Sequence, residues 1–175
     1  MTIMLVAVVC LWLGPAAQPA DFSGTWTFDR AASSRPGPDG RIVIAPILGE
    51  ECTAVQDATG LTLTIKAGAL NVTAVYRFNG ESRNLSPGQA GAAAIPVISR
   101  VSWKGNTLVI HSRSTSQVNR QEIVIETTRV LWLDEGGATL VIQRTGTPAS
   151  EVTPSRSVYR RLQGGAQGDS FGAPR

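Results

Sequence analysis

The chain has 175 residues and a net charge of +3, from 16 basic and 13 acidic residues. This length is typical of one domain, and so small and scattered an excess of charge excludes a nucleic-acid-binding surface, which needs a clustered basic face. Cys52 is the only cysteine beyond the first twenty residues, so no internal disulfide is expected in the domain. His111 is the only histidine, and no Cys/His spacing predicts a zinc site or another cofactor.

Residues 1–20 differ from the rest of the chain. An almost continuous apolar run, Ile3 to Leu13, is followed by Gly14 and Pro15. Such a segment predicts a secretory signal peptide, and it is too short for a stable membrane span. No Lys or Arg precedes the run and the cleavage site is not fixed, so the alternative is a buried N-terminal strand or helix. The expected location is the periplasm or the medium.

Residues 21–163 are predicted to form one all-β domain, because apolar and polar residues alternate with the period of half-buried strands. The clearest strands are 22–28, 61–66 and 71–78. The others are expected at 52–56, 97–104, 107–114, 120–133, 138–145 and 154–162, with 41–47 as a further candidate.

Short connections rich in turn formers, such as 57–60, 104–106 and 134–137, join these strands. Links of this kind connect antiparallel neighbours. A meander of eight to ten strands exposes two edges unless it closes, so the fold class predicted is an up-and-down barrel of the lipocalin or calycin type.

Three segments do not fit the alternation. Residues 31–40 are expected to be a Pro/Gly loop, and residues 85–94 a flexible segment across a barrel mouth. Residues 164–175 contain Phe171 as their one large apolar residue and are expected to be a disordered tail.

The phase of strand 120–133 has two interpretations. Ile123 and Ile125 share a parity with Leu131, which places Arg129 on the apolar face. Alternatively, a bulge near Thr127 shifts the register and turns Val130 and Trp132 inward.

The triplet Gly24-Thr25-Trp26 on the first strand resembles the calycin group, which includes lipocalins, fatty-acid-binding proteins and avidins. In lipocalin-like barrels an arginine of the last strand lies over this tryptophan and closes the base of the barrel. The resemblance implies that role for Arg160 or Arg161, with cation–π energy from the indole face and with Gly24 allowing close approach. Further lipocalin signatures are absent from the sequence, and the avidin set of pocket tryptophans is unmatched, which argues against biotin binding.

The mature pattern also resembles a type of uncharacterised bacterial exported protein. The motifs that carry this resemblance are 23–26, 76–80, 103–108 and 158–161. They cover nearly the whole mature chain, and they imply a fold and a bacterial, exported location without an established activity.

No arrangement of residues predicts catalysis, and the chain is expected not to be an enzyme. His111 lacks a neighbouring nucleophile motif, and the chain has no Gly-x-Ser-x-Gly elbow. Glu50-Glu51 and Asp134-Glu135 lie in predicted turns. Glu122 and Glu126 share one face of a strand, which by itself is weak support for a glycosidase pair.

Two functions are therefore expected, from different classes. The first is binding of a small hydrophobic or amphipathic ligand in the barrel, and Arg100, Arg129 or His111 pointing inward would favour an anionic amphiphile. The second is a filled barrel that acts as a structural or protein-interaction module of the cell envelope. The predicted ligand lining consists of Phe22, Trp26, Tyr76, Phe78 and Trp103.

Overall fold

Ten antiparallel strands follow one another along the residues that the computed structural model describes, which are 19–33, 46–67, 70–86, 94–118, 120–148, 152 and 154–162. The helices are α1 (Arg30–Ser33) and the 3₁₀ turn η1 (Glu135–Gly137). The predicted signal segment, apart from its last two residues, and the predicted tail lie outside this range. The strands are β1 (Gly24–Phe28), β2 (Glu51–Gln56), β3 (Gly60–Ala67), β4 (Leu70–Arg77), β5 (Glu81–Ser86), β6 (Ile95–Lys104), β7 (Thr107–Val118), β8 (Gln121–Asp134), β9 (Thr139–Thr147) and β10 (Ser155–Arg161).

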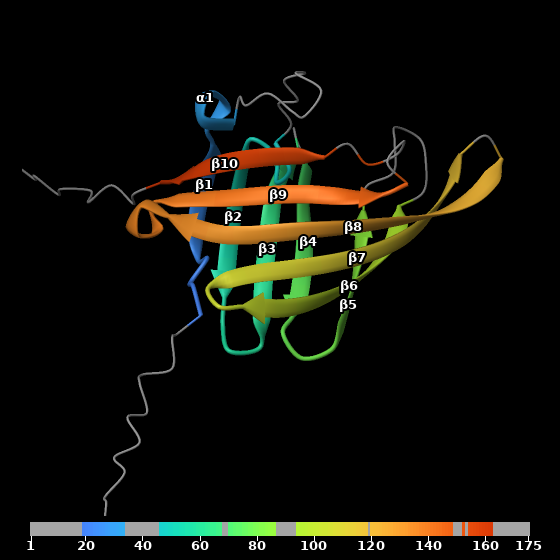
Figure 1. The fold of residues 1–175 in the computed structure, drawn as a ribbon, viewed down its shortest axis with the longest axis horizontal. Helices are drawn as coiled ribbons and strands as arrows, with labels where there is room; N and C mark the ends of the chain where they lie inside the picture. The colour runs from blue at the N-terminus through green and yellow to red at the C-terminus, as the bar shows by residue number, and fades with distance from the viewer. Residues whose placement is uncertain are drawn as a thin grey trace, which may run out of the picture.

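The strands form one sheet in the order β4-β3-β2-β1-β10-β9-β8-β7-β6-β5. The sheet curls until its edge strands β4 and β5 approach each other, so that β2–β4 cross behind β7–β10 (Figure 1). Each strand therefore has an inward and an outward set of side chains. The predicted all-β meander, closing into a barrel, is confirmed.

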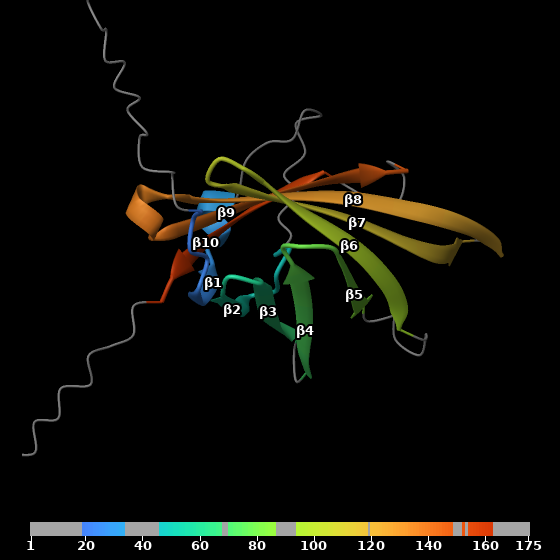
Figure 2. The same cartoon turned by 90° about the horizontal axis from the view of Figure 1, so that it is seen from below.

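Strands β4 and β5 lie beside each other at the seam of the barrel (Figure 2). No ladder of main-chain hydrogen bonds joins these two strands. Instead, the side chain of Asn84 on β5 bonds to the main chain of β4. Its Oδ1 accepts a hydrogen bond from the amide of Val75 at 2.8 Å, and its Nδ2 donates to the carbonyl of Val75 at 3.0 Å. The hydroxyl of Ser82 accepts a further bond from the amide of Arg77 at 2.7 Å. An unpaired strand edge is thus satisfied by side chains.

Strand β5 was not predicted, because its sequence, ESRNLS, has no apolar alternation. Its inward residues are the polar Ser82 and Asn84, which bond to β4 across the seam. Two further expectations differ from the structure in the few residues of theirs that it describes. Helix α1 occupies the start of the loop expected at 31–40, and Ile47, at the end of the candidate strand 41–47, lies in a turn. Residues 34–40 and 41–45 are outside the described residues.

Strand β8 runs without a bulge. Its pairing with β7 is continuous from Leu108↔Leu131 to Val118↔Gln121. The first interpretation of its phase is therefore correct: Arg129 points inward with Leu131, and Trp132 points outward.

The inward side chains pack into a core at the end of the barrel where β1 and β10 meet. Trp26 and Tyr159 are fully buried there, and the Tyr159 hydroxyl accepts a hydrogen bond from Leu48 at 2.8 Å. Burial raises the pKa of this phenol above its ordinary value. Among the described residues, no helix is long and apolar enough to cross a membrane.

Candidate functional site

The five aromatic residues predicted to line a ligand site all face the interior. Phe22 and Trp26 are fully buried, and the Trp26 indole donates a hydrogen bond to the carbonyl of Phe22 at 2.9 Å. The ring of Trp103 lies 5.9 Å from that of Phe22 and 5.5 Å from that of Phe78. These rings pack against one another, so they fill one end of the barrel.

This end is covered by Arg161, whose guanidinium carbon lies 4.5 Å from the centre of the Trp26 ring. Its Nε also donates to the carbonyl of Gly137 at 3.1 Å. Gly24 has φ +133°, a conformation that a side chain would strain. Arg160 takes no part in the stack: it points outward and pairs with Asp29 and Glu135.

Beyond the core, the inward face carries what we call the arginine row: Arg129 on β8, Arg144 on β9 and Ser155 on β10. Arg129 lies directly opposite Arg144, and Arg144 directly opposite Ser155. Each residue is two positions from an inward core residue on its strand, namely Leu131, Ile142 and Ser157. Three neighbouring strands therefore present polar groups to the same part of the interior.

Arg129 also reaches the opposite wall of the barrel. Its Nη1 donates a hydrogen bond to the hydroxyl of Tyr76 on β4 at 2.8 Å. Tyr76 is 3% exposed, so this part-buried bond anchors the guanidinium to a buried side chain.

A second inward row lies beside the arginine row and consists of small residues. Ser99 and Ser112 share a hydrogen bond of 2.8 Å between their hydroxyls. Thr127 lies opposite Ser112, and Gly146 lies opposite Thr127. This hydroxyl row (Ser82, Ser99, Ser112, Thr127, Gly146) gives this part of the interior small, mostly polar residues. The buried side chain of Val152 lies against Gly146.

The arginine row carries positive charge without a counter-charge. No Asp or Glu on the described strands points inward, and neither Arg129 nor Arg144 makes an ion pair with a described residue. The Nε atoms of both arginines and the hydroxyl of Ser155 are buried without a hydrogen-bond partner. Burial, and then the charge of Arg129, lower the pKa of Arg144. Buried donors without a partner are rare in proteins, so these three atoms distinguish the arginine row from the rest of the interior.

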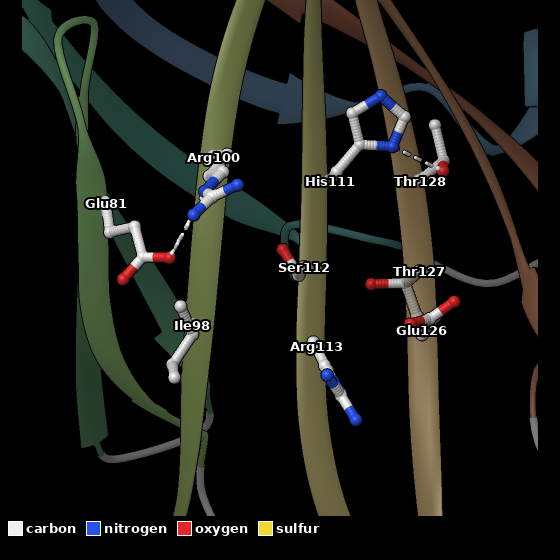
Figure 3. A pocket seen from close by; sticks show the side chains of 9 residues that line it. All are labelled: Glu81, Ile98, Arg100, His111, Ser112, Arg113, Glu126, Thr127 and Thr128. Carbon is white, nitrogen blue, oxygen red and sulfur yellow. Dashed lines mark hydrogen bonds and ion pairs between the residues drawn. The ribbon is translucent and has the colours of Figure 1, made fainter.

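Of the three cations whose inward orientation would favour an anionic ligand, Arg129 points inward, whereas Arg100 and His111 are exposed on the outer face. They border a surface hollow of about 410 Å³ on β5–β8 (Figure 3). Arg100 pairs with Glu81 at 2.8 Å, and His111 Nδ1 lies 3.0 Å from the Thr128 hydroxyl. The charged side chains that line this hollow are exposed and of both signs, which makes the hollow a weaker candidate than the interior site.

Arg144 and Ser155 were missed in the sequence. The signal was present, because Arg144 shares the parity of Leu140 and Ile142, and Ser155 that of Tyr159. Alternation on its own identifies the face of a strand, but the neighbouring strand must be known before two such residues can be placed side by side.

Within the described residues, no group of three His, Cys, Asp or Glu side chains could hold a metal ion. Known protein families and curated proteins were also compared with the sequence: no family model matches it, and no curated protein is significantly similar to it. The functional argument therefore rests on the geometry of the arginine row.

Proposed function

We propose that the protein is a non-catalytic, lipocalin-like carrier that holds a small amphipathic anion inside its barrel. The observation that carries the proposal is the pair of opposed guanidiniums, Arg129 and Arg144, with buried Nε atoms that have no partner. Two adjacent cations facing the interior are costly unless an anion neutralises them. The signal-like segment 1–20 supports export, so the proposal includes a periplasmic or secreted location in a bacterium.

The surroundings suit an amphipathic molecule. Thr127 of the hydroxyl row adds a hydroxyl group beside the arginine row. One step farther from the core, Val97 and Ile125 point inward and are half-buried. A ligand with its anionic group on the arginines could place its apolar part against these side chains, as ligand sites commonly combine a few polar groups with an apolar wall.

The proposal is tested by native mass spectrometry of the full chain, purified from its host without detergent, and by melting temperatures with anionic and neutral amphiphiles. An anionic amphiphile at about 100 times its Kd should raise the melting temperature by roughly 5–10 °C. R144Q should lose most of this shift. R113Q removes an equal charge from the outer face and should keep it.

The alternative function, a filled barrel that acts through protein contacts, is favoured by one observation: the aromatic residues at the closed end pack tightly and are largely buried. A clean apo mass, with no shift for any amphiphile, would contradict the carrier and favour this alternative.

A further inference from the structure

The arginine row differs from a site for a single carboxylate in the number of charges that it offers. Arg129 and Arg144 both point inward, and the described strands place no acidic side chain beside them. A monoanion would neutralise one guanidinium and leave the other half-buried without a counter-charge. A dianion would neutralise both, and partial burial strengthens the preference for the dianion over the monoanion.

The unpartnered donors of the arginine row also differ, in number and arrangement, from those of a site for a single carboxylate. The unpartnered groups are Arg129 Nε, Arg144 Nε and Ser155 Oγ, which come from three adjacent strands. The Nη1 of Arg129 is already used by Tyr76. A carboxylate has two oxygens in one plane and suits a single guanidinium fork. A tetrahedral oxyanion has three terminal oxygens in different directions, one for each strand.

We propose that the anionic group recognised by the arginine row is a phosphate monoester dianion, bound by Arg129, Arg144 and Ser155. This inference rests on the proposed function, since it names the head group of the same ligand. The ester oxygen then carries an organic group past the hydroxyl row toward Val97 and Ile125, the half-buried apolar residues beyond it.

The small side chains of the hydroxyl row support an organic group that extends from the arginine row toward Val97 and Ile125. Gly146 lies opposite Thr127, and the Ser99 and Ser112 hydroxyls are satisfied by each other. Among the residues described, the arginine row supplies the buried side-chain donors on this wall that have no hydrogen-bond partner. The head group is therefore expected at the arginines, with the organic part outside them.

The test compares three ligands with the same octyl chain on the full-length protein by isothermal titration calorimetry. Octyl phosphate is a dianion at about pH 8, above its second pKa of about 6. Octyl sulfate has three terminal oxygens and one charge, and octanoate has two oxygens and one charge. We expect octyl phosphate to bind at least about tenfold more tightly than either monoanion, a factor equivalent to 1.4 kcal/mol. At about pH 5, where octyl phosphate is a monoanion, its advantage over octyl sulfate should disappear.

Variants identify the residues responsible. R144Q should reduce the preference for octyl phosphate over octyl sulfate by about tenfold, while the outer-face variant R113Q should leave it unchanged. S155A should weaken octyl phosphate and octyl sulfate, which have a third oxygen, more than octanoate. A preference that survives in R144Q would overturn the inference.

The outcomes separate the two proposals. If all three ligands bind with similar affinity and R144Q weakens them equally, the carrier function stands and the phosphate inference is wrong. If octyl sulfate equals octyl phosphate at both pH values, charge count is not recognised and the inference is wrong. If none of the three binds, both proposals fail.

Discussion

Arg129 and Tyr76 are joined by a hydrogen bond of 2.8 Å that links β8 to β4 across the inside of the barrel. The bond separates two chemical environments. On one side lies the core with Trp26 and Tyr159, and on the other lies the hydroxyl row. This hydrogen bond thus lies at the boundary between the hydrophobic core and the part of the interior that we propose binds a ligand.

Removing this bond should destabilise the protein. We expect Y76F to lower the free energy of unfolding by about 1.5 kcal/mol, because a bond to a charged donor is lost in a buried setting. Urea denaturation of wild type, Y76F, R129M and the double variant gives the coupling between the two residues. Fully additive effects would show that the contact contributes nothing.

Removing Arg144 should have the opposite effect. We expect R144M to raise the free energy of unfolding of the ligand-free protein by about 1 kcal/mol, since it removes an unpaired, partly buried cation next to Arg129. R161M is the matched control: it deletes the cation that covers Trp26 and should cost about 1–2 kcal/mol. If R144M were as destabilising as R161M, Arg144 would be a structural residue.

The seam should open more easily without Asn84. N84A removes both bonds to the main chain of Val75, so we expect hydrogen exchange of the Val75 amide to become about tenfold faster or more, while global stability changes less. R83A, at an exposed neighbouring position on β5, is the control. Unchanged protection of Val75 in N84A would show that the seam is held by other contacts.

The thiol of Cys52 gives a prediction for alkaline pH. Burial, and then the neighbouring Glu51, raise its pKa to about 12 from 9.0. The folded state therefore resists an ionisation that the unfolded chain undergoes, and stability falls as the pH rises through this interval. The free energy of unfolding of wild type, relative to C52A, should decline above pH 9.0 by at most about 1.4 kcal/mol per pH unit. A flat difference up to pH 10.5, about the middle of the interval, would contradict this.

Much of the fold could be predicted from alternation, since strands such as β3 and β4 bury one face and expose the other. Strand β5 could not, because Ser82 and Asn84 face inward to bond the seam rather than to fill the core. A polar residue of that kind looks like a loop residue until its partner strand is known.

The site shows the same limit. One interpretation of the sequence placed Arg129 inward. Its proposed role in binding an anion depends on Arg144, which is fifteen positions later on the adjacent strand. The aromatic residues, by contrast, were readily identified as inward, but their size allowed both a lining and a filled core. Packing distances between Phe22, Trp103 and Phe78 were needed to decide that they fill space.

The seam has a consequence for the connectivity of the chain. Strands β1 and β10 pair with each other, and the amide of Leu162 donates to the carbonyl of Thr25 at 2.8 Å, so the first and last strands are held side by side. The chain passes from β4 to β5 through a tight turn that includes Gly80, where the main chain forms no ladder. A circular permutant, with Leu162 linked to Ala20 and a new start at Gly80, would therefore keep every strand pairing of the sheet.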